Sequence, residues 1–134
     1  MRPTAKAQQI REYSMAAETV GQNIVNIFER RKAAAIALCV YYAGLILAEF
    51  RKRQGDAVGT GEFWDNRTTN AARLVFSDAI IEDDEIGFFI AHMIEYGVYL
   101  EIANDRQNEA LRPLIEEFYP LFKKDLAEIY GVAA

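Results

Sequence analysis

Apolar side chains at helical spacing characterise the first part of the chain. Between Thr4 and about residue 29 they recur at steps of three and four, which predicts an amphipathic helix with Thr4 as its N-cap. Gly21 lies within this stretch, and because glycine weakens a helix it is a candidate interruption. The apolar positions are Ile10, Tyr13, Ala17, Val20, Ile24, Ile27 and Phe28.

A second helix is predicted from about Lys32 to Gln54, around an unbroken apolar run from Ala33 to Ala48 with basic residues on both sides. The run has 16 residues, which at about 1.5 Å each span roughly 24 Å, whereas the hydrocarbon core of a bilayer is about 30 Å thick. It is also rich in Ala, which is only weakly hydrophobic. We therefore expect a helix buried in a protein core, with a membrane anchor as the alternative.

Small residues form a narrow stripe on this second helix. The stripe covers about 60° of the helix surface, given roughly 100° of rotation per residue, and consists of Ala33, Ala37, Gly44 and Ala48. Such a stripe lets another backbone come close. Because larger apolar residues cover the other faces, we expect this helix to be sandwiched between other elements and not half exposed.

The stretch "GDAVGTGEFWDN" after residue 54 combines three glycines with small and acidic residues, which predicts a loop over residues 55–70. Phe63 and Trp64 are large aromatic residues within this loop. They either pack back onto the core of their own domain or serve as anchors in a pocket of a partner protein. Both alternatives remain open from the sequence.

A change to period-two spacing and to β-branched and aromatic residues begins near Arg73. The segments "RLVFSDAII" and "IGFFIAHMI", joined by the acidic turn "EDDE", predict a β-hairpin, and "YGVYLEIA" predicts a third strand or a short helix. Four like charges in a row seek water, so we expect a solvated hairpin tip. The tip consists of Glu82, Asp83, Asp84 and Glu85.

The last part of the chain, about residues 108–130, has the apolar stripe of a helix. Pro120 is expected to bend or break this helix and Gly131 to end it. The order of elements predicts a single α+β domain over residues 1–134, with N-terminal helices and a C-terminal helix packed on one face of a small antiparallel β-sheet. Its expected parts are helices over 4–54, a loop over 55–70, strands over about 71–103 and the final helix.

Charge is divided unevenly along the chain. Residues 1–54 contain nine Lys and Arg against four Glu, a balance of +5, and residues 55–134 contain six against sixteen acidic residues, a balance of −10. The acidic part repels nucleic acid, and the basic residues lack interleaved aromatic side chains, so sequence-specific nucleic-acid binding is not expected. The asymmetry favours head-to-tail packing of identical subunits, in which a basic edge meets an acidic edge.

Residues suited to catalysis are few. The only histidine, His92, lies in an apolar predicted strand, where a structural role is more common than a catalytic one. The only cysteine, Cys39, has no partner for an internal disulfide. We therefore predict no catalytic residue, no cofactor and no metal. A ligand-binding protein of unknown chemistry is an alternative, and it would need a polar pocket around His92 and Glu101.

Two segments together resemble a known family. "EFWDNRTTNAARLVF", residues 62–76, is similar to an aromatic and Arg-Thr-Gly-Asn-Ala-Arg region in small neck and tail-completion proteins of long-tailed bacteriophages. "EYGVYLEIANDRQNEALRPLIEEF", residues 95–118, is similar to their Tyr-Gly-x-Tyr-Leu-Glu element and the helix after it. Thr69 departs from the family pattern, in which Gly follows the Thr. The matching positions are Arg67, Thr68, Asn70, Tyr96, Gly97, Tyr99, Leu100 and Glu101.

The resemblance implies a structural virion protein without catalytic residues, which forms part of a ring at the junction of head and tail. It implies a homo-oligomer, with a hexameric ring preferred and a dodecamer next, assembled in the host cytoplasm. The expected partners are head-completion or connector proteins and tail-tube or tail-terminator proteins, with no membrane. We expect the interface to use Phe63, Trp64, Arg67, Tyr96 and Tyr99.

Acidic side chains would suit the channel of such a ring, because they repel the phosphate backbone and let DNA slide. The acidic second half of the chain supplies two candidates for this position. One is the hairpin tip formed by Glu82, Asp83, Asp84 and Glu85, and the other is the loop from Asp56 to Glu62.

Overall fold

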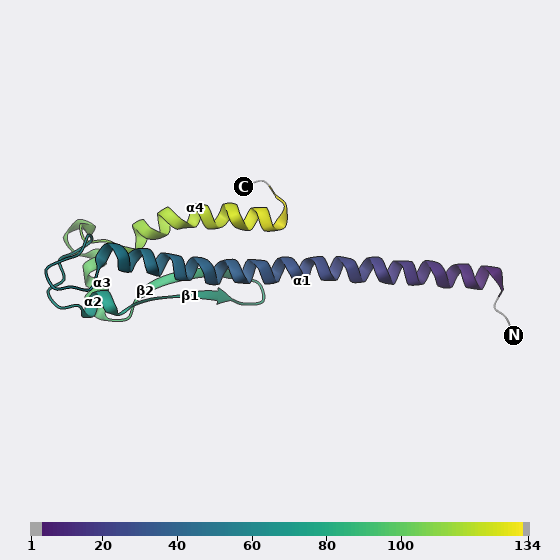
Figure 1. Cartoon of the computed structure of the whole chain (residues 1–134), viewed down its shortest axis with the longest axis horizontal. Helices are drawn as coiled ribbons and strands as arrows, with labels where there is room; N and C mark the ends of the chain where they lie inside the picture. The colour runs from purple at the N-terminus through teal and green to yellow at the C-terminus, as the bar shows by residue number, and fades with distance from the viewer. Residues whose placement is uncertain (1–3, 133–134) are drawn as a thin grey trace. The chain divides into compact units, whose positions relative to one another are not determined.

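The computed structural model describes residues 4–132. Its elements, shown in Figure 1, are α1 (Ala5–Gln54), α2 (Asn70–Arg73), β1 (Val75–Ile81), β2 (Ile86–His92), α3 (Glu95–Ile102), the 3-10 turn η1 (Asn104–Arg106) and α4 (Leu111–Tyr130). By its internal contacts the chain divides into two compact units, one that ends at Ala34 and one that begins at Ala35. Residues of α1 belong to both units.

The first unit consists of the N-terminal part of α1. Thr4 caps the helix, because its hydroxyl accepts a hydrogen bond from the Ala7 N–H at 3.2 Å, and this confirms the predicted N-cap. The predicted apolar stripe is exposed throughout this unit. Its exposed members are Ile10, Tyr13, Ala17, Val20, Ile24, Ile27 and Phe28.

The prediction of two separate helices before residue 55 is wrong, because α1 is a single helix of 50 residues. Gly21 does not interrupt it. A glycine costs a helix only about 1 kcal/mol relative to Ala, which the hydrogen bonds of the flanking turns offset. The residues between Glu29 and Lys32 include no Gly, Pro or capping side chain that would end the helix.

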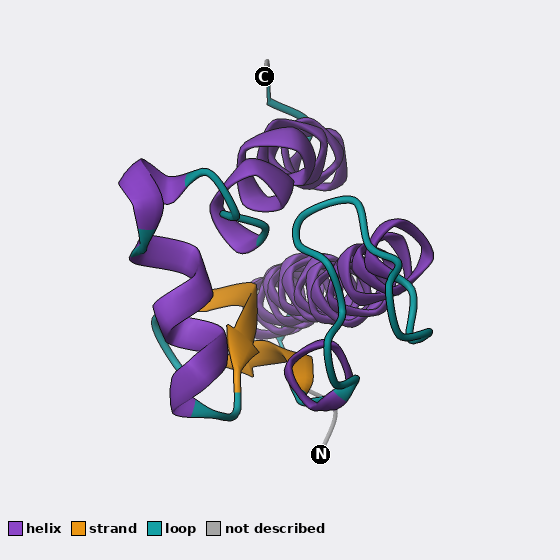
Figure 2. Ribbon diagram, turned by 90° about the vertical axis from the view of Figure 1, so that its left-hand side faces the viewer, coloured by secondary structure: helices purple, strands orange, loops and turns teal. Residues whose placement is uncertain are grey.

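The core of the second unit forms around the C-terminal part of α1. The β-hairpin lies along one side of this helix and α4 along another (Figures 1 and 2). The rings of Tyr42, Phe88 and Phe122 meet where α1, β2 and α4 come together, with centroid distances of 5.1 to 5.8 Å. The buried residues of α1 are Ala35, Cys39, Tyr42, Ala43, Ile46, Phe50 and Gln54.

The stripe of small residues on α1 is exposed, so the prediction that this helix is sandwiched on all sides is wrong. Among residues 4–132, apart from its chain neighbours and the nearby backbone of its own helix, no heavy atom lies within 4 Å of the position that a Cβ at Gly44 would take. The buried face of α1 includes Tyr42, Ile46 and Phe50, which bury more apolar area than Ala or Gly. The exposed stripe consists of Ala33, Ala37, Gly44 and Ala48.

The predicted hairpin is confirmed. β1 and β2 are antiparallel, with Val75 opposite His92 and Ile81 opposite Ile86, and the turn between them is the acidic tip. Of the two alternatives for "YGVYLEIA", the structure has the helix, α3. Helices cover one face of this two-stranded sheet, so the α+β class is confirmed.

α4 continues through Pro120, so this residue does not break the helix. Gly131 follows the last turn with a φ of 68° and ends it as predicted. By length and composition α1 could cross a membrane, but a core helix of a soluble protein passes the same test. In the structure 33% of its most apolar 18-residue stretch is buried.

Candidate interaction site

A buried amide pair organises the loop between α1 and α2. Gln54, the last residue of α1, is fully buried. Its Oε1 accepts the N–H groups of Phe63 at 3.1 Å and Trp64 at 3.3 Å, and its Nε2 donates to the Trp64 carbonyl at 2.8 Å and to Asn66 Oδ1 at 2.9 Å. Gln54 therefore fixes where both aromatic residues of the loop lie.

Asn66 closes the loop from its other end. Its Nδ2 donates to the carbonyls of Gln54, Gly55 and Ala57 at 3.2 to 3.4 Å. Gly61 is needed for the same turn, because its φ is +134° and a Cβ there would lie 2.0 Å from the Trp64 carbonyl oxygen. These contacts hold the backbone that leads to Arg67.

The structure resolves the two alternatives for Phe63 and Trp64 in favour of packing on their own domain. Trp64 is only 7% exposed, and its ring centroid lies 5.9 Å from that of Phe50 and 6.0 Å from that of His92. Phe63 is half-buried and stacks on Phe50 at 6.0 Å, beneath the Arg53 guanidinium. Neither ring therefore projects as an anchor for a partner's pocket.

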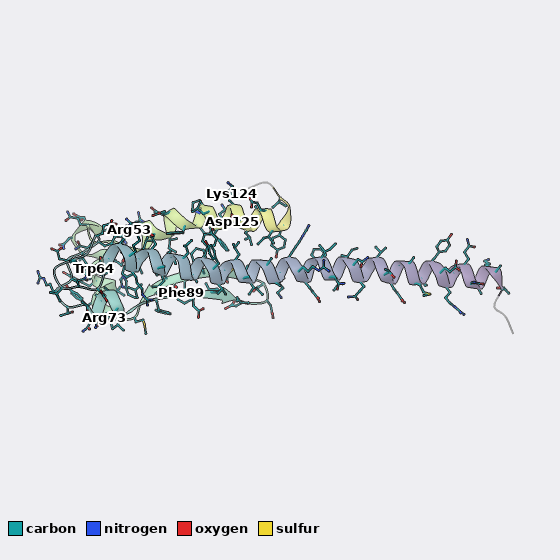
Figure 3. All side chains as sticks on the ribbon, viewed as in Figure 1. Arg53, Trp64, Arg73, Phe89, Lys124 and Asp125 are labelled. Carbon is teal, nitrogen blue, oxygen red and sulfur yellow. The ribbon has the colours of Figure 1, made fainter. Side chains whose placement is uncertain are left out.

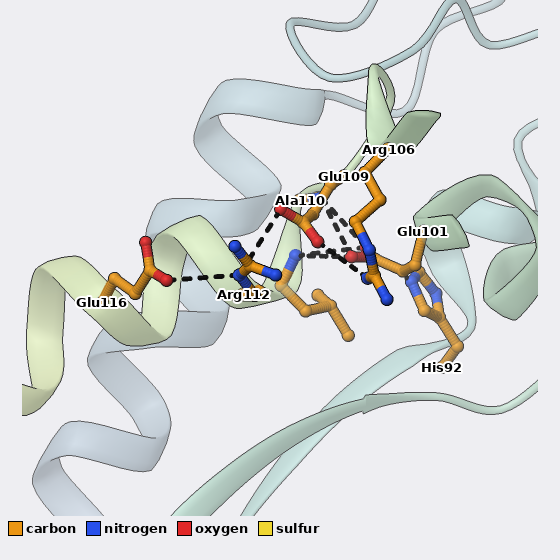
Figure 4. A network of polar contacts seen from close by, with 8 residues as sticks. His92, Glu101, Arg106, Glu109, Ala110, Arg112 and Glu116 are labelled. Atoms are coloured by element: carbon orange, nitrogen blue, oxygen red, sulfur yellow. Dashed lines mark hydrogen bonds and ion pairs between the residues drawn. The ribbon is translucent and has the colours of Figure 1, made fainter. Parts of the chain in front are cut away.

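His92 and Glu101 belong to a polar network at the start of α4 (Figure 4). His92 Nε2 and Glu101 Oε1 are 2.9 Å apart, and the His92 side chain is almost fully buried. Both Glu101 oxygens accept the N–H groups of Ala110 and Leu111 at 3.0 to 3.2 Å. A carboxylate at a helix N-terminus satisfies free N–H groups and interacts favourably with the helix dipole, so this pair joins β2, α3 and α4.

Gly97 lets α3 lie directly against His92. A Cβ at Gly97 would lie 2.5 Å from His92 Nδ1, closer than real contacts allow. This close approach buries one side of α3 and turns Tyr96 and Tyr99 outward, at 54% and 56% exposure. Their rings stack at 6.1 Å.

The loop and α3 together enclose a surface hollow of about 460 Å³, which we name the tyrosine hollow. It brings together four of the five predicted interface residues, since Phe63 does not line it. Asp65 and Arg67 supply one charge of each sign and two asparagines supply amides, so the hollow suits a polar partner group beside aromatic contacts. Its lining is Trp64, Asp65, Arg67, Tyr96, Tyr99, Leu100, Asn104 and Asn108.

A second hollow, of about 360 Å³, lies where α1 ends beside α2, and we name it the arginine hollow. It is lined by Arg51, Gly55, Asp56, Ala72 and Arg73. Sequence reasoning did not identify it. Arg51 and Arg73 are far apart in the chain, and each looks like an ordinary basic residue at a helix end.

The acidic tip of the hairpin is a four-residue turn in which all side chains are exposed. The Glu82 N–H donates to the Glu85 carbonyl at 2.8 Å and closes the turn. Among the described residues, no group of three or more His, Cys, Asp or Glu side chains is arranged to hold a metal ion. Cys39 is fully buried, and this burial raises the pKa of its thiol.

No protein-family model, no curated protein and no solved structure matches this chain.

Proposed function

We propose that this protein is a structural protein of a tailed-bacteriophage virion and forms part of a ring at the head–tail junction, as a neck or tail-completion protein. In this role it joins head to tail and lets DNA pass, without catalysing a reaction. A hexameric ring is the preferred assembly and a dodecamer the next.

One observation carries the proposal. The two segments that resemble the neck and tail-completion family are separated by residues 77–94, most of which form the hairpin. Even so, Trp64 and Arg67 of the first segment and Tyr96 and Tyr99 of the second line the same hollow. Exposed Tyr and Arg side chains around a hollow are typical of protein interfaces, where these residue types contribute most to affinity. The geometry is thus suited to binding another protein.

Unpartnered apolar surface gives the proposal further support. The N-terminal part of α1 exposes apolar side chains at three- and four-residue steps, and the stripe of small residues farther along is exposed as well. An isolated helix owes little stability to propensity alone and usually needs tertiary packing on its apolar face. Neighbouring subunits of a ring, or head and tail components, would provide that packing.

The proposal is tested by the mass of the purified protein in detergent-free buffer. Light scattering is measured for the protein alone and after addition of head-completion or tail-tube proteins, and electron microscopy reveals whether the product is a closed ring. A soluble protein that forms a ring, or joins one when a partner is added, supports the proposal. A monomer that ignores every such partner overturns it.

A variant pair shows whether the tyrosine hollow takes part. We expect Arg67→Ala to weaken assembly, because its guanidinium is exposed at the hollow. Arg112→Ala is the matched control, since it removes an exposed arginine of α4 whose surface ion pairs contribute little stability. Equal assembly by both variants would exclude the tyrosine hollow from the interface.

A membrane-associated protein anchored by Ala33 to Ala48 is the second candidate, because α1 is long and apolar enough to cross a bilayer. In that case the protein would need detergent to stay soluble and would float with lipid vesicles in a density gradient. Solubility at high concentration without detergent, with no flotation, excludes this candidate.

A further inference from the structure

Groups of opposite charge lie at the two ends of β1. Arg73 ends α2 just before the strand begins, whereas the acidic turn follows the strand after Ile81 (Figures 1 and 3). The seven residues of β1 extend over roughly 23 Å at about 3.3 Å each. Side chains cannot span this distance, so the acidic turn cannot pair with Arg73 of its own chain.

The positive charge of the arginine hollow is not fully neutralised by nearby carboxylates. Neither Arg51 nor Arg73 has a carboxylate oxygen within 4.0 Å among residues 4–132, and both side chains are exposed. Asp56 also lines the hollow, which leaves one positive charge in excess. Two guanidinium groups beside a hollow of this size are suited to receive a carboxylate side chain, because each can bind both of its oxygens.

The negative charge of the acidic turn is likewise not neutralised by basic side chains. Its four carboxylates are exposed, and none forms an ion pair with a basic group of the described chain. Adjacent like charges repel one another, and a basic partner would relieve this repulsion. The turn also projects from the end of the hairpin (Figure 1), where it is accessible to another molecule.

We propose that the acidic turn of one copy docks into the arginine hollow of the next copy. The inference rests on the proposed ring and names the contact between its subunits. Because the two surfaces differ, the contact is heterologous, and contacts of this kind close into a ring or continue as a filament. The occupant is a second copy of this chain, because one chain carries both complementary surfaces at positions that cannot meet within it. The lumen-facing position suggested for the same turn is the competing outcome.

Charge substitutions on each surface test the proposal. The turn variant carries Asp83→Lys and Asp84→Lys, which change the charge of the turn from −4 to 0. The hollow variant carries Arg51→Glu and Arg73→Glu, which change the charge of the hollow from +1 to −3. All four side chains are exposed, so both variants should fold, which circular dichroism verifies. Light scattering then measures assembly of the wild type, of each variant alone, of the two variants mixed, and of a chain with all four changes.

We expect each variant alone to assemble about tenfold or more weakly than the wild type. The turn variant loses the net charge that attracts the hollow, and the hollow variant places acidic groups opposite the acidic turn. The mixture should assemble again, since the two new lysines of one variant meet the acidic hollow of the other, and the unchanged acidic turn and arginine hollow match as well. The chain with all four changes should assemble by itself. Wild-type assembly should weaken as salt rises to about 0.5 M, because salt screens exposed charges.

Two matched controls change net charge by the same amounts at exposed positions elsewhere. Glu95→Lys with Glu128→Lys matches the turn variant, and Lys123→Glu with Lys124→Glu matches the hollow variant. We expect both controls to assemble like the wild type. If they weaken assembly as strongly as the turn and hollow variants, net charge and not docking is responsible, and the proposal is wrong.

The outcomes also separate this inference from the ring function. A ring that forms equally well from the turn variant overturns the docking contact, agrees with a lumen-facing turn, and leaves the ring function standing. A wild-type protein that stays monomeric, together with a mixture of the turn and hollow variants that also stays monomeric, overturns the docking contact. The ring function fails as well only if head-completion and tail-tube proteins do not recruit it.

Discussion

The imidazole Nε2 of His92 and the carboxylate Oε1 of Glu101 lie 2.9 Å apart, although His92 ends β2 and Glu101 belongs to α3. The same carboxylate accepts the first N–H groups of α4, a helix that has no side-chain cap from its own N-cap residue. One carboxylate thereby connects three elements. The geometry accounts for both residues as a structural junction between elements.

We expect Glu101→Ala to lower the free energy of unfolding by about 2–4 kcal/mol, because two helix N–H groups and a buried imidazole lose their acceptor. Glu101→Gln should cost less, since its amide oxygen still accepts one of these hydrogen bonds. Denaturation by urea measures both. Glu95→Ala, which changes an exposed residue of the same helix, is the control. Equal stability of the two Ala variants would show that the junction is not important for folding.

Gly97→Ala is expected to destabilise the protein by about 1–3 kcal/mol, the usual cost of forcing extra volume into a packed interior. The added methyl would meet the His92 ring, which is buried and cannot move aside. Gly44→Ala is the matched change on an open helix surface, and it should stabilise the protein by roughly 0.5–1 kcal/mol. Thermal unfolding of the two variants should therefore shift in opposite directions. Unchanged or raised thermal stability of Gly97→Ala would contradict the close packing of α3 on His92.

Gln54→Leu should release the loop that forms the tyrosine hollow. The buried N–H groups of Phe63 and Trp64 would lose their acceptor, at a cost of about 1–3 kcal/mol for each group left unsatisfied. The fluorescence of Trp64, the only tryptophan, should shift to longer wavelength as the ring becomes hydrated. Gln107→Leu, at an exposed position, is the control and should leave the spectrum unchanged. An unchanged spectrum in Gln54→Leu would mean that other contacts hold Trp64.

Tyr42 should make stability depend on alkaline pH. Burial, followed by its hydrogen bond to the Asp125 carboxylate, raises the pKa of Tyr42 to about 12, from 10 in a free tyrosine. Folding therefore favours the neutral phenol. Its contribution is fully present below about pH 10 and is lost between about pH 10 and pH 12, at a rate of up to 1.4 kcal/mol per pH unit.

Comparison of the wild type with Tyr42→Phe isolates this effect, because both proteins share every other titrating group. At pH 7 the variant should be about 1 kcal/mol less stable, since it lacks the hydrogen bond to Asp125. This difference should shrink and then reverse above pH 10. A difference that stays constant from pH 8 to pH 11.5 would show that the phenol is not protected in the folded state.

Several local features could be predicted from the sequence because neighbouring residues encode them. The period-two pattern around "EDDE" predicted the hairpin and its turn, Thr4 predicted a capped helix start, and Gly131 a helix end. The break expected between two helices was wrong, because the residues between Glu29 and Lys32 include no Gly, Pro or cap that would end a helix. The α+β class followed from the grouping of the strands.

The candidate site could be predicted only in part. The resemblance led us to expect Arg67, Tyr96 and Tyr99 at an interface, which stays a prediction. The hollow that they line depends on Gln54, Asn66, Gly97 and His92, whose partners are distant in the chain. The arginine hollow had no signal in the sequence, because it exists only where α1 ends beside α2.

The sequence by itself determined most of the helical and strand segments, since backbone hydrogen bonding and side-chain spacing act over a few residues. For "YGVYLEIA" it left helix and strand open, and the structure has the helix α3. Only the tertiary structure decided which faces are covered. It buried Trp64, for which the sequence left burial and exposure open. It exposed the stripe of small residues on α1, which the sequence predicted to be covered. The reason is that burial is set by the total apolar area removed from water when distant segments pack together, a quantity that no local pattern contains.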